Sequence, residues 1–299
     1  MSLLAVNFHY FRETSYKSGI YPTTRMKLEK QLDALSRVYK FVSQEEIASW
    51  VQERAIPNGN HCVFTLDDGL KEQMEVFDFL NSKGIPAIFY VPTDPIRHQK
   101  VLPTHQLHYV RTQLDDKEIF DFFQQHTSIA TYQFDDQLLE NQYRYDDTLA
   151  RRVKFYLNFV LPEKEKTRLV QQLFEALVSD EATFARKLYM DENDLRRLAK
   201  AAALGSHGSA HLPLAMLAPE EAEQDIIASV RYLESVGKQA IVSFSYPFGG
   251  EKAVSPSIAP ILERAGIQFA FTMKRGFNYE EQFSDPLFLR RMDTKDVPV

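Results

Sequence analysis

Short apolar runs alternate with amphipathic stretches along most of the chain. In three places the amphipathic stretch passes through a glycine (Gly84, Gly237 or Gly266) and leads into a β-branched or aromatic run. Glycine is the usual left-handed stop of a helix, so each unit predicts a helix followed by a strand. The pattern predicts eight strands, near residues 3–9, 39–42, 61–67, 87–91, 204–207, 240–244, 268–272 and 287–292.

Alternation of short buried strands with helices is typical of a parallel sheet whose faces are covered by helices. About eight such strands fit a closed or nearly closed barrel better than an open sheet. We therefore predict the α/β class and a distorted, nearly closed (β/α) barrel, with residues 1–299 forming a single domain.

Residues 97–188 interrupt the barrel pattern, because they are polar and aromatic and have helical spacing. We predict a helical insertion between two barrel strands, packed over one rim. It contains aspartate pairs at 115–116, 135–136 and 146–147, which are typical of helix starts and solvated loops. The alternatives are a lid that faces the substrate and a contact with another subunit in a homo-oligomer.

Composition narrows the class of protein. Of the 299 residues, 44% are hydrophobic and 25% charged, as in a soluble protein with a real core. The net charge of −6 argues against a nucleic-acid partner, and no apolar run approaches the roughly 18 residues of a membrane span. The amino terminus lacks the pattern of a secretion signal. Cys62, the single cysteine, suits a reducing compartment, so we expect a cytoplasmic protein.

Candidate chemistry lies where two predicted strands end. Asp67 and Asp68 follow the strand at 61–66, and a turn at the next glycine lets both carboxylates face one pocket. His207 and His211 lie four residues apart after another strand, within reach of a single ion. Asp68 and the two imidazoles leave coordination positions open, as in a catalytic zinc site. Cobalt, nickel and manganese suit the same donors.

Each motif alone has an ordinary structural explanation. An Asp-Asp pair is more often a helix cap or turn, and a His-x3-His pair is often surface or core. Here both abut predicted strand ends, which is where barrel enzymes carry their chemistry. The combination therefore favours a metal-dependent active site.

Three motifs resemble those of the polysaccharide deacetylase family, also called NodB-homology or carbohydrate esterase family four. Residues 65–69 (Thr-Leu-Asp-Asp-Gly) resemble its Thr-Phe-Asp-Asp-Gly motif. Residues 205–214 resemble the second motif, His-(Ser/Thr)-x-x-His, and residues 245–249 the third, which forms one wall of the groove. The resemblance covers residues 1–95 and 190–299.

The resemblance implies metal-assisted removal of an N-acetyl group from a sugar, in a glycan, a glycan precursor or a nucleotide-linked sugar. Asp68, His207 and His211 would hold one divalent ion, zinc in the first place. Asp67 would be the general base that deprotonates the attacking water. The backbone N–H of Phe248 would donate to the oxyanion. Tyr246, beside it in the third motif, would face the substrate.

The chain departs from the family pattern in three places. Gly208 replaces the serine or threonine that steadies the second motif, a task that Ser209 could take over. Ser245 stands where the third motif usually has an arginine, and Arg291 is our first choice as the substitute guanidinium; its alternative is an ordinary salt bridge. No histidine follows the second motif. His9 resembles the general acid that circularly permuted members carry near the amino terminus.

Two other functions remain open at this point. Relatives of the fold open cyclic ureides, so a non-sugar amide is an alternative substrate. A degenerate carbohydrate-binding module without turnover is the alternative from another class, and the missing serine or threonine and arginine favour it. The intact base and ligand set favour an enzyme.

Overall fold

The computed structural model describes residues 1–16 and 18–297, and the chain divides into two compact units. The first unit contains residues 1–13, 22–100 and those from 185 onward, and the second contains residues 14–21 and 101–184. Apart from residues 14–21, the second unit falls inside the predicted insertion. The short segment 14–21 carries no pattern that would assign it there.

Eight strands are present in the described residues, and every ladder between them is parallel. They are β1 (Ser2–Phe8), β2 (Lys40–Phe41), β3 (Asn60–Leu66), β4 (Ala87–Val91), β5 (Leu204–Ser206), β6 (Ser243–Ser245), β7 (Phe269–Arg275) and β8 (Leu289–Asp293). Seven close a ring in the order β1-β8-β7-β6-β5-β4-β3, because β1 also pairs with β3; β2 pairs only with the start of β3. The predicted (β/α) barrel is confirmed.

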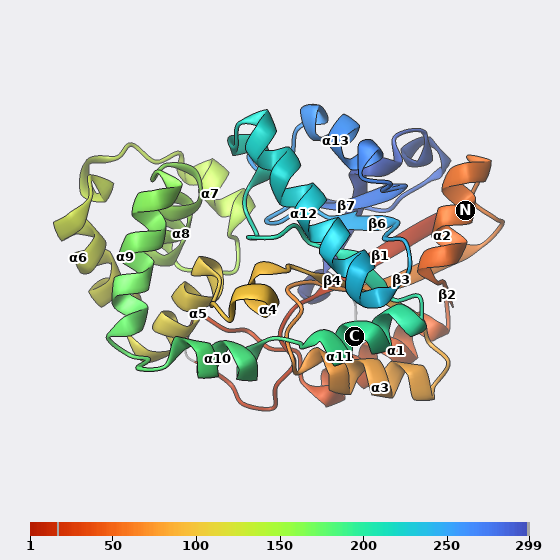
Figure 1. Cartoon of the computed structure of the whole chain (residues 1–299), viewed down its shortest axis with the longest axis horizontal. Coiled ribbons are helices and arrows are strands. Elements are labelled where there is room, and N and C mark those ends of the chain that lie inside the picture. Colours follow the sequence, from red (N-terminus) through yellow and green to blue (C-terminus); the bar gives the residue numbers. More distant parts are fainter. Residues whose placement is uncertain (17, 298–299) are drawn as a thin grey trace. The chain divides into compact units, whose positions relative to one another are not determined.

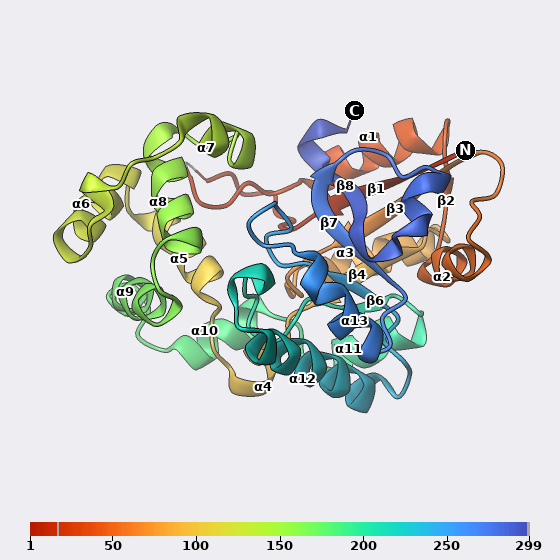
Figure 2. The same cartoon turned by 90° about the horizontal axis from the view of Figure 1, so that it is seen from above.

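The helices of the first unit surround these strands (Figures 1 and 2). They are α1 (Arg25–Ser36), α2 (Gln44–Glu53), α3 (Gln73–Ser82), α4 (Asp94–His98), α11 (Glu192–Lys200), α12 (Pro219–Gly237) and α13 (Ala259–Arg264). The helix α10 (Glu181–Leu188) spans the boundary between the two units. Across the described residues, no helix has both the length and the apolar character that a membrane crossing requires.

The strands bury both faces, and the two faces differ in character. One face packs on the helices: Phe64 and Phe89 share a core cluster with Ile226 of α12. The other face lines the barrel interior, with apolar residues such as Leu3 and Val63 near the strand starts. Toward the strand ends this lining becomes polar, through Asn7, Thr65, Asp67, Ser245 and Arg291, all buried. The barrel therefore carries its polar layer at the carboxyl ends of its strands.

The end of α12 differs from the prediction. Gly237 is the last helical residue, and the left-handed residue that ends the helix is Lys238, with φ of 57°. A Cβ on Gly237 would lie 2.9 Å from the Cβ of Ala199 in α11, closer than real Cβ contacts. This glycine therefore serves the close approach of two helices rather than the stop.

The second unit is helical in its described residues. It comprises α5 (Pro103–Gln113), α6 (Asp116–His126), α7 (Asp136–Gln142), α8 (Thr148–Phe159) and α9 (Glu163–Glu175). The prediction of helix starts is confirmed, because Asp115, Asp135 and Asp147 accept backbone N–H groups as the N-caps of α6, α7 and α8. The prediction that these pairs are solvated is wrong for Asp146, which is buried. Buried Arg111 pairs with Asp116 and Asp146 within this unit.

Candidate metal centre and active site

Four strands of the barrel deliver the candidate residues to one end. Asp67 and Asp68 directly follow β3, His207 follows β5, and His9 follows β1. Arg291 lies within β8. All of these strands are parallel in one ring, so their carboxyl ends meet at the same rim, where parallel barrels present functional side chains.

Backbone conformation is unusual at two of the candidate ligands. Asp68 has φ of 81° and His211 has φ of 55°, in the left-handed region that side chains rarely adopt. Asp67 still follows the strand geometry of β3 and lies in the polar layer of the barrel interior, whereas the backbone at Asp68 departs from that geometry. A Cβ at Gly69, where φ is 60°, would collide with Val91, so the tight turn requires glycine. Strained residues of this kind cluster at functional sites.

The structure brings Asp68, His207 and His211 together. One ligand atom from each lies within 4.8 Å of the other two. Asp68 Oδ1 is 3.5 Å from His207 Nε2 and 3.4 Å from His211 Nε2. All three residues are buried, and the two imidazole rings are 4.9 Å apart between centroids.

The donor set fits a divalent cation. His207 Nδ1 lies 2.7 Å from the carbonyl oxygen of Ser245, which can only accept, so Nδ1 carries the proton of the neutral ring. Nε2 then presents its lone pair toward Asp68, as expected of a histidine that binds metal through one nitrogen. One carboxylate and two imidazoles are ligands that zinc accepts. The arrangement is therefore a possible metal site.

Asp67 lies beside this group and is paired with Arg291. Arg291 Nη1 donates to Asp67 Oδ1 at 2.9 Å, and Nη2 forms an ion pair with Oδ2 at the same distance. Ser245 Oγ donates to Asp67 Oδ2 at 3.0 Å and accepts from Arg291 Nη2 at 2.8 Å. Asn7 accepts from Arg291 Nη1 at 3.0 Å. Ser245, which replaces the arginine of the family's third motif, thus contacts both the Asp67 carboxylate and the Arg291 guanidinium.

Charges around Asp67 set its protonation. Burial alone would raise the pKa of Asp67, but the Arg291 charge, then the His207 charge and the Arg291 hydrogen bonds, hold it below its ordinary value. Burial opposes a charge on His207 as well, yet Asp67 and Asp68 raise the pKa of that imidazole. The same negative field that favours a proton on His207 favours a cation among these side chains.

His9 lies at the same rim as Asp67. Phe8 pairs with Leu66, so His9 and Asp67 occupy the next positions on adjacent strands. Gln73 of α3 ties the two together, because its amide nitrogen donates to the carbonyl oxygens of His9 at 2.8 Å and of Asp67 at 2.6 Å. His9 is partly exposed, and its charge contributes to lowering the pKa of Asp67.

The third motif places its two aromatic residues differently. Phe248 is half-buried and has φ of 61°, and its ring lies 4.9 Å from that of His211 between centroids. Tyr246 is 1% exposed and packs in the core against Phe244 and Phe288. The Tyr246 side chain is therefore not part of the substrate site that we propose.

The polar layer includes residues to which sequence reasoning assigned no role. Asn7 and Thr65 each interrupt an apolar strand, and both accept hydrogen bonds from Arg291. A buried polar residue within an apolar strand is the signal that could have marked them. Gln73 carries no such signal, because its partners depend on how α3 packs against the strand ends.

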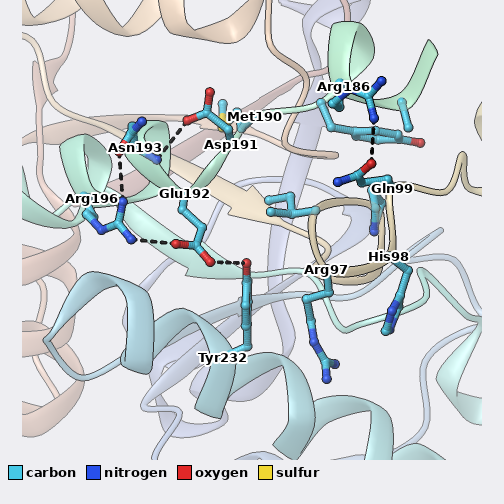
Figure 3. Close-up of a pocket in the computed structure, with 14 residues that line it drawn as sticks. Arg97, His98, Gln99, Arg186, Met190, Asp191, Glu192, Asn193, Arg196 and Tyr232 are labelled. Carbon is cyan, nitrogen blue, oxygen red and sulfur yellow. Dashed lines mark hydrogen bonds and ion pairs between the residues drawn. The ribbon is translucent and has the colours of Figure 1, made fainter. Parts of the chain in front are cut away.

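A separate cavity of about 880 Å³ lies outside this rim and is shown in Figure 3. Arg97 and His98 of α4, Arg186 of α10, Glu192 of α11 and Tyr232 of α12 are among its lining residues. None of the eight site residues predicted from the sequence lines it. We therefore place the candidate chemistry at the barrel rim and not in this cavity.

A closed β/α barrel with a possible metal site at its carboxyl rim defines the class of protein, and comparison with known proteins identifies the family. The family model described as polysaccharide deacetylase matches residues 116–270, more than half of the chain. The chain belongs to the polysaccharide deacetylase family, which supports a hydrolase that deacetylates carbohydrate. The match includes His207 and His211 and leaves out the Asp67-Asp68 pair.

Solved structures share the fold at low sequence identity. IcaB from Ammonifex degensii is 16% identical with a TM-score of 0.58, over 97% of this chain and 91% of that one. The Streptococcus pyogenes deacetylase PplD, in complex with acetate, is 13% identical with a TM-score of 0.55, over 98% and 92%. The BpsB deacetylase domain from Bordetella bronchiseptica is 13% identical with a TM-score of 0.56, over 98% and 95%. Among curated proteins, no sequence matches this chain.

Proposed function

We propose that the protein is a metal-dependent hydrolase that removes an N-acetyl group from a sugar. One observation carries the proposal: a potential ligand set of Asp68, His207 and His211 lies beside Asp67, a buried carboxylate held ionised by Arg291. Membership of the polysaccharide deacetylase family supports carbohydrate as the substrate class.

Asp68, His207 and His211 would hold the ion, with zinc as our first choice. A bound divalent cation lowers the pKa of water and polarises an amide carbonyl. Two neutral imidazoles and one carboxylate would leave positions open for water and substrate.

Asp67 is the proposed general base, and Arg291 is the residue that positions it. Asp67 Oδ2 lies 4.0 Å from His207 Nε2, next to the ligands. It would accept the proton of the water that attacks the acetyl carbon. The hydrogen bond and ion pair from Arg291 orient this carboxylate and keep it ionised at neutral pH.

His9 is the proposed general acid. As the carbon–nitrogen bond of the amide breaks, His9 would donate a proton to the departing sugar amine, and acetate would be the second product. The backbone N–H of Phe248 would donate to the oxyanion that forms on the amide oxygen. The left-handed conformation of Phe248 supports a specialised backbone role there.

Metal binding and acetate release test the proposal together. The protein is stripped with a chelator, titrated with zinc, cobalt, nickel and manganese, and assayed for acetate from N-acetylglucosamine oligomers and N-acetylated nucleotide sugars. Acetate release restored by one of these ions is the expected result. Ring opening of a cyclic ureide without acetate release would indicate the amide alternative. Sugar binding without turnover at any metal loading would indicate a carbohydrate-binding module.

A further inference from the structure

The loop between the two candidate histidine ligands has an unusual residue at its start. The family pattern that the second motif resembles has serine or threonine at this position, and this chain has Gly208. Its φ is 71°, and a Cβ there would lie 2.4 Å from Asp225 Oδ2. The left-handed backbone therefore disfavours a side chain at this position, and any Cβ would have to displace the Asp225 carboxylate.

Asp225, in the second turn of α12, uses that space to bind the loop. Its Oδ2 accepts the backbone N–H of Ser209 and its Oδ1 accepts that of Ala210, each at 2.9 Å. Its own carbonyl oxygen accepts the hydroxyl of Ser209 at 2.9 Å. Asp225 is 8% exposed and Ser209 is 5% exposed, so water competes little for these bonds.

We infer that Asp225 is a positioning residue for the metal site, which holds the His207–His211 loop in the conformation that brings both imidazoles to one ion. The inference rests on the proposed metal site. It assigns to a helix carboxylate the task that a side chain on the loop itself performs in the family pattern. Ser209 contributes its hydroxyl to the same contact but does not replace the missing side chain by itself.

The rest of the loop backbone is held from the opposite side. Thr93 and Asp94, which lead into α4, donate their backbone N–H groups to the carbonyl oxygens of Gly208 and Ser209 at 3.2 and 3.0 Å. Gly208 N–H donates to Ser206 Oγ at 3.3 Å. Asp225 therefore supplies the acceptors for the N–H groups of Ser209 and Ala210, which lie between the two ligands in the sequence.

The left-handed backbone of His211 makes this support necessary. A non-glycine residue at φ of 55° relaxes toward other conformations unless its surroundings determine it. Outer groups that orient metal ligands typically matter by about 10- to 100-fold in metal affinity. We expect an effect of that size on removing the Asp225 carboxylate.

The Asp225→Asn variant tests the inference, with Glu223→Gln as its matched control. Asparagine keeps the shape but offers only one oxygen acceptor, so one loop N–H faces an NH₂ group. Glu223 lies on the same helix, is partly exposed and pairs with Arg264, so its change removes an equal charge away from the loop. The readouts are the Kd for Co²⁺, the visible spectrum of the Co²⁺ form and the Tm of the metal-free protein.

We expect Asp225→Asn to raise the Kd for Co²⁺ by about 10- to 100-fold and to change the cobalt spectrum, and Glu223→Gln to leave both unchanged. A folded Asp225→Asn protein with the wild-type Kd and spectrum would overturn the inference while the metal site stands. Wild-type protein that binds no ion would instead overturn the proposed function. Should Asp225→Asn fail to fold, Gly208→Ala decides, because its Cβ must displace the Asp225 carboxylate from the loop. A raised Kd supports the inference, and an unchanged Kd and spectrum overturn it.

Discussion

Arg291 and Asp67 face each other across the barrel interior, 224 residues apart in the chain, and form an ion pair with one hydrogen bond and a second nitrogen–oxygen contact, each of 2.9 Å. Both side chains are almost fully buried, and Ser245 bridges them. A buried carboxylate without this partner would have a raised pKa, so the pair decides whether Asp67 is ionised at neutral pH.

Replacing Arg291 with glutamine should move the acidic limb of the pH profile. Burial would then dominate, so the pKa of Asp67 would rise and kcat/KM would fall off at higher pH than in the wild type. The wild-type pair, with a lowered Asp67 pKa, stabilises the fold above the ordinary carboxyl pKa and loses this effect as pH falls. Breaking it should cost about 3–5 kcal/mol at neutral pH. Arg290→Gln, on the same strand, is the control, and equal pH profiles for the two variants would contradict the assignment.

Variants of the adjacent residues Asp67 and Asp68 should distinguish a loss of catalysis from a loss of metal binding. Asp67→Asn should retain the ion and lose about 10²- to 10⁴-fold in kcat, as expected when a general base is removed. Asp68→Asn should lose most of its metal affinity, because a ligand is neutralised. Metal content after dialysis and acetate release measure the two effects. Wild-type turnover in Asp67→Asn would exclude it as the base.

His9→Ala should lower kcat and leave the metal in place. If His9 protonates the leaving amine, the rate should fall by about 10²-fold or more. His98→Ala, which changes an exposed histidine at the edge of the separate cavity, should have wild-type kinetics. Loss of the ion from His9→Ala would make His9 a ligand instead of an acid.

Metal should stabilise the wild-type fold. An ion that binds only the folded state adds about 2.7 kcal/mol when its concentration is 100-fold above Kd. The Tm of stripped protein should therefore rise with added zinc, and the rise should be abolished in His211→Ala. A similar rise in His211→Ala would show that the ion binds elsewhere.

The second unit offers a stability prediction independent of catalysis. Arg111, with a side chain 1% exposed, binds Asp116 through Nε and Nη2 at 2.6 and 3.0 Å. Burial raises the pKa of Asp116, but Arg111 lowers this pKa by more, so the net shift is downward. Arg111→Met should therefore destabilise the protein by about 3–5 kcal/mol at neutral pH. Denaturant unfolding should show the deficit shrinking as pH falls through the carboxyl range, since Asp116 then loses its charge in both proteins. A deficit independent of pH would contradict this origin.

Local pattern was sufficient for the barrel, because strands such as β3 and β4 are short apolar runs and helices such as α12 are amphipathic. Asp68, His207 and His211 were also visible, since strand ends in a barrel converge whatever the intervening sequence. Arg291 could be proposed only as one of two alternatives, because its partner depends on which strand closes the ring.

Other features depend on tertiary packing and were missed. Asp225 looks like an ordinary polar residue of an amphipathic helix, and only the packing of α12 against the histidine loop gives it two backbone N–H groups to accept. Gly237 was misinterpreted for the same reason, since its neighbour Ala199 belongs to another helix. Such residues are determined by contacts between elements and not by local pattern.

Closure of the ring through β1 and β8 has a consequence for biosynthesis. β1 leads into His9, and β8 holds Arg291, so the earliest and latest strands to leave the ribosome both serve the same rim. Until β8 emerges, Asp67 has no guanidinium partner. The nascent chain therefore acquires the Asp67–Arg291 ion pair only when the last strand of the barrel is made, and premature termination before residue 291 yields a protein without it.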